Sequence, residues 1–173
     1  MPADEGVIET SRLLLRPLRA DDLQDLHDVV FGDPAVTWDG TAGTLEETRG
    51  LLDSKRRHFE EHGFGMMAVV DRGDGAVIGY AGLQRMAGGP EVEIGYYLGR
   101  RAWGRGLATE LAHALVDRAF GDLELRRLVA VVRPENEASK RVLAKAGLHP
   151  EGLEHHYGAD VELWSMDAPS RRG

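Results

Sequence analysis

The five residues from Leu128 to Val132 constrain the fold more than any other segment of the chain. Their sequence, Leu-Val-Ala-Val-Val, has no polar residue and stops two residues before Pro134. Such β-branched runs are typical of strands buried on both faces, and proline cannot continue a hydrogen-bonded ladder. Residues 107–119 predict a long helix before this strand, and residues 136–147 predict a shorter one after it. The second half of the chain therefore has an α/β pattern.

The first half also alternates between strand and helix patterns. A strand is expected over 10–17 and a short helix over 23–30. The segment that follows the helix holds three Gly and one Pro in twelve residues, so it is expected to be a loop. Thr44 and Glu47 form a capping box, which predicts the start of a helix that ends near Gly63.

Strand patterns then dominate until the long helix begins. Residues 66–71 and 76–83 predict a hairpin, because the Gly and Asp residues between them favour a tight turn. A turn at Gly88-Gly89-Pro90 precedes a strand over 92–98, which we place centrally in the sheet, and 149–166 is weakly strand-like. This order of elements predicts a mixed α/β sheet in one domain.

Length and composition indicate one soluble domain over 1–173, with an ordered core over about 8–168. A chain of 173 residues with 42% hydrophobic and 29% charged residues can bury an ordinary core. The absence of cysteine excludes disulfides, thiolate zinc sites and a cysteine acyl-enzyme, and it suits a reducing cytoplasm. No metal site is expected, and His155 and His156 lack the context of a metal-binding pair.

Charge and hydropathy exclude two classes of partner. A formal net charge of -8 argues against binding to nucleic acid. No apolar run is long enough to span a membrane, and the acidic start from Met1 to Glu5 is unlike a secretory leader. The expected location is therefore the cytoplasm.

The chemistry concentrates in the turn around Gly104 and Gly106, between a predicted strand and the long helix. Glycines allow close approach of the backbone, and the helix N-terminus adds partial positive charge, so an anion such as pyrophosphate is favoured. Arg101 and Arg105 add cations beside it. The turn matches neither a dinucleotide fingerprint nor a P-loop. Taken alone, the two glycines could also form only a tight turn with solvated arginines.

A wider pattern resembles the GNAT superfamily of acyl-CoA-dependent N-acyltransferases. Arg101-x-x-Gly104-x-Gly106 is similar to its pyrophosphate-binding motif. Glu93-Ile-Gly-Tyr96, the segment 103–110, Asn136-x-x-Ser139 and the opening Thr10-x-Arg-Leu-x-Leu-Arg-Pro17 resemble the ribosomal-protein N-acetyltransferase branch, the RimJ and RimL type. The resemblance runs from about Thr10 to Met166. It implies a mostly antiparallel sheet of six to seven strands, splayed at its centre and flanked by about four helices.

The resemblance also implies acetyl-CoA as cofactor and a set of residues that bind it. The free edge of the strand over 92–98 would bind the pantetheine arm, and backbone N–H groups around Tyr96 to Leu98 would supply an oxyanion hole. The implied cofactor-binding residues are Tyr96, Tyr97, Leu98, Arg101, Trp103, Gly104, Arg105, Gly106, Leu107, Ala108, Thr109, Asn136 and Ser139.

Two residues are candidates for catalysis. Glu93 lies where some members carry a general base, and partial burial would raise its pKa towards the working range. Glu93 could equally serve only to orient the substrate. Many members carry a tyrosine seven residues after the equivalent of Asn136, where this chain has Leu143, so Ser139 is the candidate that protonates the leaving thiolate. Ser139 could also bond only local backbone, and Asn136 could also be a helix cap.

The acceptor is an amine whose identity stays open. The resemblance suggests a protein or peptide N-terminal amine, and a small amine is the alternative; a third hypothesis is a non-catalytic sensor of acyl-CoA. Trp38 and Tyr157 could line an amine pocket together with Glu93, although a lone aromatic is more often packing. Asp39, Glu46 and Glu47 could attract a cationic substrate or be solvated. A homodimer is possible through the C-terminal strands.

Overall fold

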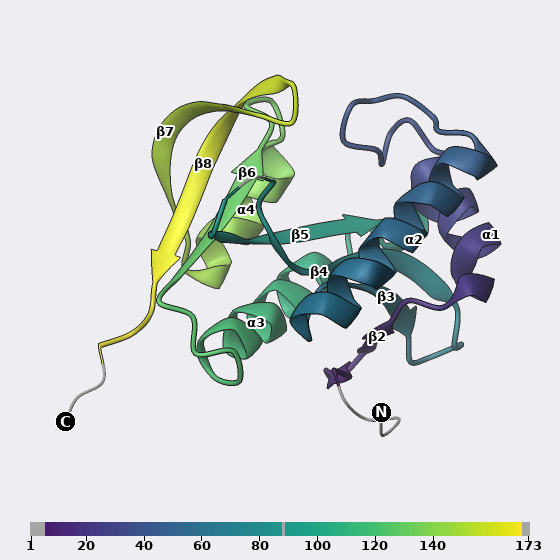
Figure 1. Ribbon diagram of the computed structural model, residues 1–173, viewed down its shortest axis with the longest axis horizontal. Coiled ribbons are helices and arrows are strands. Elements are labelled where there is room, and N and C mark those ends of the chain that lie inside the picture. The colour runs from purple at the N-terminus through teal and green to yellow at the C-terminus, as the bar shows by residue number, and fades with distance from the viewer. Residues whose placement is uncertain (1–5, 88, 171–173) are drawn as a thin grey trace. The chain divides into compact units, whose positions relative to one another are not determined.

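Residues 6–87 and 89–170 are described by a computed structural model of the chain (Figure 1). The acidic start at Met1 to Glu5 and Gly88 of the predicted turn lie outside these residues. Among the described residues, no helix has both the length and the apolar character needed to cross a membrane.

Eight strands form one mixed sheet in the order β1-β2-β3-β4-β5-β6-β8-β7. The strands are β1 (Ile8–Glu9), β2 (Leu13–Pro17), β3 (Met66–Asp71), β4 (Val77–Arg85), β5 (Val92–Leu98), β6 (Arg127–Val132), β7 (His149–His156) and β8 (Ala159–Asp167). β5 and β6 are parallel and share one registered pair, Glu93 with Val129, whereas β2 with β3, β3 with β4, β6 with β8 and β7 with β8 are antiparallel. The α/β class and the central place of β5 are confirmed.

The strand count exceeds the six to seven expected. The two-residue strand β1 was too short to predict, and the weakly patterned tail forms two strands, β7 and β8. β7 is exposed along almost its whole length, so its sequence lacks the alternation that marks a half-buried strand.

Four α-helices accompany the sheet, and their ends follow local sequence signals. They are α1 (Leu23–Leu26), α2 (Leu45–His62), α3 (Leu107–Phe120) and α4 (Glu137–Ala146). The predicted capping box is confirmed, because Thr44 Oγ1 accepts from Glu47 N at 3.1 Å and Glu47 Oε2 accepts from Thr44 N at 2.8 Å. Gly63 ends α2 at φ 76° and Gly147 ends α4 at φ 102°, both left-handed positions that favour glycine.

The helix expected over 23–30 is helical but not a regular α-helix. A 3-10 turn at Ala20–Asp22 leads into α1, and a π-helical turn follows at His27–Phe31. The Gly32 N–H donates to the carbonyl oxygen of His27, five residues back, at 2.7 Å, which is the widened π spacing. The apolar periodicity predicted the buried face but not the change in helical pitch.

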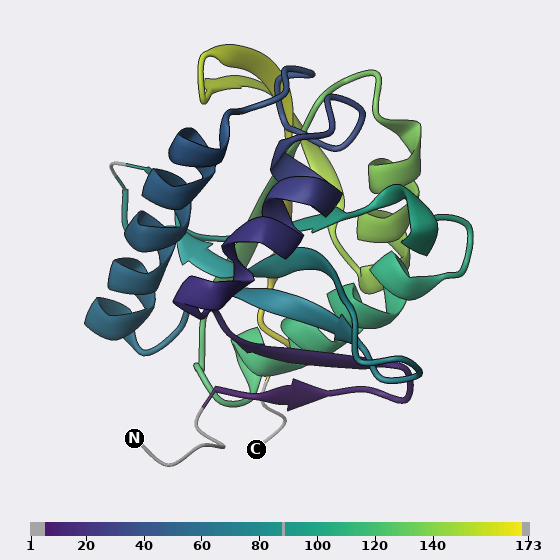
Figure 2. The ribbon, with the colours of Figure 1, turned by 90° about the vertical axis from the view of Figure 1, so that its right-hand side faces the viewer.

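Contacts within the chain group its residues into two compact units. Unit 1 comprises the chain up to Gln84 together with Gly95–Leu107, and unit 2 comprises Arg85–Ile94 and the chain from Ala108 onward. In unit 1, α1 and α2 cover one face of β3 and β4 (Figure 2). The core beneath these helices contains Leu26, Val30, Leu52, Met66 and Tyr80. The amphipathic faces of the two helices therefore build the first core.

In unit 2, β6 lies between β5 and β8, and the β7–β8 hairpin continues the sheet beside it (Figure 1). Val129 of β6 and Leu163 of β8 form a small core cluster with Met86. α4 contacts β6 and buries Leu143. The central position of β6 explains why its sequence is an uninterrupted apolar run.

One buried ion pair holds the start of unit 1 together. Arg16 of β2 donates to both carboxylate oxygens of Asp22, at 2.7 and 2.9 Å, and Arg19 N donates to Asp22 Oδ2 at 2.7 Å. The Asp22 residue is only 4% exposed. Burial by itself raises the pKa of Asp22, but the hydrogen bonds from Arg16 and Arg19 outweigh it, so the pKa lies below its usual range.

We expect Asp22→Asn to lower the free energy of unfolding by about 3 kcal/mol, because the charge of Arg16 is then left without its buried partner. The exposed neighbour gives a matched control, since Asp21→Asn removes the same charge without breaking the pair. Urea unfolding of both variants measures the difference.

The loss should depend on pH in a defined direction. The pKa of Asp22 is lower in the folded than in the unfolded state, so its contribution is complete above the unfolded pKa of about 4 and disappears as the pH falls through the folded pKa. Equal unfolding free energies of Asp22→Asn and Asp21→Asn at pH 7 would contradict this assignment.

Candidate functional site

The glycine-rich turn has two left-handed positions directly before α3. A 3-10 turn, η3 (Arg100–Ala102), follows β5, and Gly104 and Gly106 then adopt φ values of 73° and 74°. A Cβ on Gly104 would meet no atom within 4 Å, so the left-handed backbone, and not crowding, is what selects glycine there. The exposed backbone of residues 103–106 leads straight into the first turn of α3, whose N–H groups have no acceptor within the helix.

The two arginines of this turn are bound to acids of the β3–β4 hairpin. Arg101 donates to Asp74 at 2.5 Å, and Arg105 donates to Asp71 at 3.3 Å. The carbonyl oxygen of Arg105 accepts from Arg12 Nη1 at 2.7 Å. All of these residues belong to unit 1, so the turn is held in place by side chains and not only by its glycines.

Two further contacts fix the segment between β5 and the turn. The indole N–H of Trp103 donates to the carbonyl oxygen of Leu98 at 2.8 Å, although the residue is exposed. Arg100 makes a bidentate ion pair with Asp33, at 2.6 and 2.8 Å, which ties the loop after the π-helical turn to η3. The hydrogen bonds from Arg100 and from Ala35 N lower the pKa of Asp33 to about 2.

This arrangement can hold an anion by its backbone. Consecutive N–H groups at a helix N-terminus carry partial positive charge and suit phosphate oxygens. Since Arg101 and Arg105 already pair with carboxylates, their charges are balanced within the protein. The backbone of the turn therefore has the chemistry to bind an anion, and the ion pairs of the two arginines hold the turn in position.

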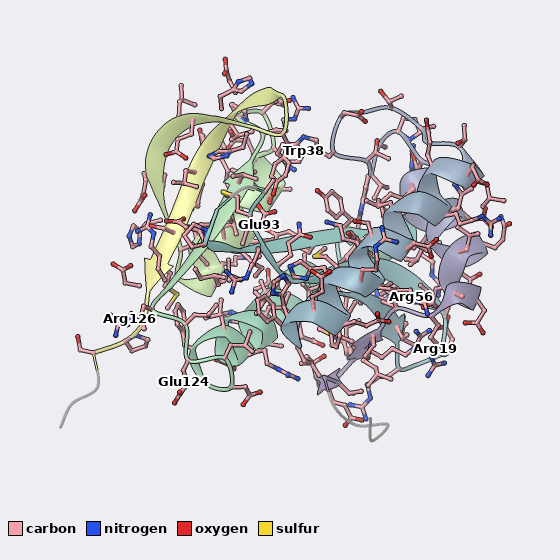
Figure 3. All side chains as sticks on the ribbon, viewed as in Figure 1. Arg19, Trp38, Arg56, Glu93, Glu124 and Arg126 are labelled. Atoms are coloured by element: carbon pink, nitrogen blue, oxygen red, sulfur yellow. The ribbon has the colours of Figure 1, made fainter. Side chains whose placement is uncertain are left out.

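Glu93 is a buried carboxylate near the start of β5 (Figure 3). The residue is 4% exposed, and its Oε1 accepts a hydrogen bond from the hydroxyl of Tyr157. Both residues belong to unit 2. Both residues are candidates from the sequence, but their pairing is not predictable from it, because they are 64 positions apart and no local pattern links them.

Asn136 and Ser139 both lie at the start of α4. Asn136 is the N-cap, and its Oδ1 accepts from the backbone N–H of Ser139 at 3.1 Å. The capping role considered for Asn136 is confirmed. Leu143 is buried in the core, so the position that carries a tyrosine in many family members offers neither a hydroxyl nor exposure here.

Several other candidate residues lie in exposed or half-buried positions, whereas the side chains of Leu98 and Leu107 are buried. Trp38 is half-buried in the loop of unit 1, Tyr96 and Tyr97 are half-buried on β5, and Asp39 and Glu46 are exposed. Glu47 is the residue of the capping box, so its carboxylate already has a structural role.

Two histidines of β7 pair with acids. His155 pairs with Asp160 at 3.0 Å and His156 with Glu154 at 2.7 Å, in both cases on the exposed β7–β8 hairpin. Over residues 6–87 and 89–170, no group of three or more His, Cys, Asp or Glu residues is arranged to hold a metal ion.

The family to which the chain belongs follows from comparison with known protein families. The model of the acetyltransferase (GNAT) domain matches residues 12–149, which include β2, the glycine-rich turn and the start of α4. The chain belongs to the GNAT family.

Alignments with related sequences and with solved structures cover most of this GNAT chain. The probable N-acetyltransferase YjcK of Bacillus subtilis is 33% identical over 76% of this chain and 70% of its own. The crystal structure of an acetyltransferase from Agrobacterium tumefaciens has a TM-score of 0.81 and 30% identity, and the match covers 92% of this chain and 93% of that one. RimL, described as a ribosomal L7/L12 alpha-N-protein acetyltransferase in complex with coenzyme A, has a TM-score of 0.78 at 22% identity, over 94% of this chain and 98% of its own.

We expect Gly104→Ala to lower the free energy of unfolding of this GNAT protein by about 1–2 kcal/mol, because an L-residue is strained at a left-handed φ. The matched control is Gly50→Ala in the interior of α2, where a Cβ also has open space. That change should raise the unfolding free energy by about 0.5–1 kcal/mol. Urea unfolding of the two variants tests the pair, and a stabilised Gly104→Ala would contradict the backbone assignment.

Proposed function

We propose that the protein is an acetyl-CoA-dependent N-acetyltransferase that transfers the acetyl group directly to a primary amine. The left-handed turn at Gly104 and Gly106 carries the proposal, because it lies directly before a helix N-terminus, where backbone N–H groups suit a diphosphate, in a chain of the GNAT family. Bound acetyl-CoA would supply an activated acetyl group as a thioester. A direct transfer needs few reactive side chains, since positioning lowers much of the barrier.

Cofactor binding is proposed for two sets of groups. The backbone from Trp103 to Thr109 would bind the diphosphate, with Arg101 and Arg105 holding the turn through their acids. The edge of β5 at Tyr96 to Leu98 would bind the amide-rich pantetheine arm and donate N–H groups to the developing oxyanion. A role for Asn136 in binding the arm is compatible with its cap, because a carboxamide also has N–H groups to donate.

The proposed role of Glu93 is to take a proton from the acceptor. An aliphatic amine is mostly an ammonium ion at neutral pH, so it must lose a proton before its nitrogen can attack. The Glu93 carboxylate is buried and accepts a hydrogen bond from the hydroxyl of Tyr157 on the β7–β8 hairpin. A buried carboxylate of this kind is suited to accept a proton, directly or through a water.

Ser139 is proposed to donate a hydrogen bond or proton to the leaving thiolate. The position of the family tyrosine is occupied by the buried Leu143, so α4 needs another hydroxyl for this step. Ser139 is half-buried in the first turn of α4.

We propose a peptide or protein N-terminal amine as the acceptor. The support is the likeness of Glu93-Ile-Gly-Tyr96 and Asn136-x-x-Ser139 to the ribosomal-protein branch, together with the fold shared with RimL. Fold alone does not decide an acceptor, so a small-molecule amine is the competing outcome of the test.

The acceptor is tested by measuring thiol release from acetyl-CoA with a panel of N-terminal peptides and small amines. We expect release that depends on the amine and a kcat/KM at least tenfold higher for the best peptide than for the best small amine. The reverse order would replace the peptide by a small acceptor. Tight binding of acetyl-CoA with no thiol release from any amine would support the non-catalytic sensor and contradict the proposed transfer.

Glu93→Gln tests the proposed base. We expect kcat to fall about 10²–10⁴-fold, because the variant keeps the shape of the side chain but cannot accept the proton. Affinity for coenzyme A should stay unchanged in calorimetry. The matched control is Glu91→Gln, which alters an exposed glutamate two residues earlier. Unchanged activity of Glu93→Gln across the pH range would remove Glu93 from the mechanism.

A further inference from the structure

The β7–β8 hairpin has an unusual residue at its tip. His156 pairs with Ala159, so the loop has two residues, Tyr157 and Gly158, with φ values of 53° and 74°. Two successive left-handed residues define a type I′ turn, for which Asn-Gly is the preferred sequence. A bulky residue at the first position is a conformational outlier, and such outliers persist where the surrounding structure uses them.

The hydroxyl of this strained tyrosine reaches the carboxylate of Glu93. Tyr157 is 44% exposed, whereas Glu93 is 4% exposed, so the side chain extends from the surface to a buried acid. An ionised carboxylate is costly to bury unless hydrogen-bond donors compensate for the lost water. The tip of the hairpin supplies such a donor from a part of the chain far from β5 in sequence.

We propose that Tyr157 is the positioning residue of Glu93: its hydroxyl holds the buried carboxylate in one orientation and in its ionised form, and this use explains the left-handed tyrosine at the hairpin tip. The inference rests on the proposed function of Glu93 as the proton acceptor. Tyr157 acts through Glu93 and takes no proton from the substrate itself.

Several other titratable groups of unit 2 form ion pairs with one another. On the hairpin, His155 pairs with Asp160 and His156 with Glu154. Arg127 of β6 forms ion pairs with three acids, Glu91 at 3.7 Å, Glu151 at 2.7 Å and Asp167 at 3.7 Å. Lys140 of α4 pairs with Glu137 and with Glu162 of β8 at 3.1 and 3.0 Å. The phenol of Tyr157 donates to Glu93 itself, so its removal should alter Glu93 directly.

The first test removes only the hydroxyl. Loss of a hydrogen bond to a charged group should raise the pKa of Glu93 by about one to two pH units in Tyr157→Phe. Carbon-13 NMR of protein labelled at glutamate side chains measures this pKa without any substrate, and Glu93→Gln identifies the signal. In the active enzyme, the acidic limb of the kcat/KM profile should move upward by the same amount.

The second test separates positioning from stability. Tyr157→Asn also removes the hydroxyl but introduces the preferred turn residue, so we expect it to have a higher Tm than Tyr157→Phe while kcat/KM falls as in Tyr157→Phe. Glu124 is the other described non-glycine residue at positive φ, 50°, and it is exposed. Glu124→Asn is therefore the matched control for the backbone effect, with no change in kcat/KM.

The outcomes distinguish this inference from the proposed function. If the pKa of Glu93 and the acidic limb are the same in Tyr157→Phe as in the unaltered protein, the inference is overturned. A raised pKa of Glu93 in a protein that acetylates no amine would support the pairing and refute the transfer reaction. A Tyr157→Phe variant that loses stability but keeps the kcat/KM profile of the unaltered protein would show that the tyrosine is only a structural part of the hairpin.

Discussion

The left-handed backbone at Gly104 and Gly106 is the constraint on which the proposed site depends. It turns the chain from β5 into α3 within a few residues, and the exposed residues 103–106 come directly before the helix, whose first N–H groups have no acceptor within it. Ion pairs from Arg101 and Arg105 to the β3–β4 hairpin hold this geometry. A preformed array of donors loses little conformational entropy on binding, which favours recognition of a diphosphate.

The second constraint is electrostatic and lies within unit 2. A buried carboxylate at Glu93 is unfavourable unless it is hydrogen-bonded, and the protein supplies a donor from a strained position on an exposed hairpin. Left-handed backbone conformations thus serve two different purposes in this chain. At Gly104 and Gly106 the conformation orients the backbone of the turn, and at Tyr157 it directs the tyrosine side chain towards Glu93.

Much of the fold could be predicted because its signals are local. The capping box at Thr44, the cap at Asn136 and the bounds of β3 and β5 follow from short patterns, and the structure reproduces them. The strand β1, the π-helical turn and the exposed strand β7 had no such pattern. In the candidate site, the glycines were predictable from type and spacing. The pairing of Glu93 with Tyr157 and of Arg105 with Asp71 was not, because long-range contacts depend on how strands are arranged in the sheet.

Calorimetric titration with coenzyme A and with pantetheine tests the central claim most directly, since pantetheine has the arm without the diphosphate. If the turn at Gly104 and Gly106 binds the diphosphate, coenzyme A should bind one to one and at least a hundredfold more tightly than pantetheine. Alanine at Gly104 should reduce that difference without affecting the weak binding of pantetheine. Equal affinities for the two molecules, or no heat with coenzyme A, would contradict the account.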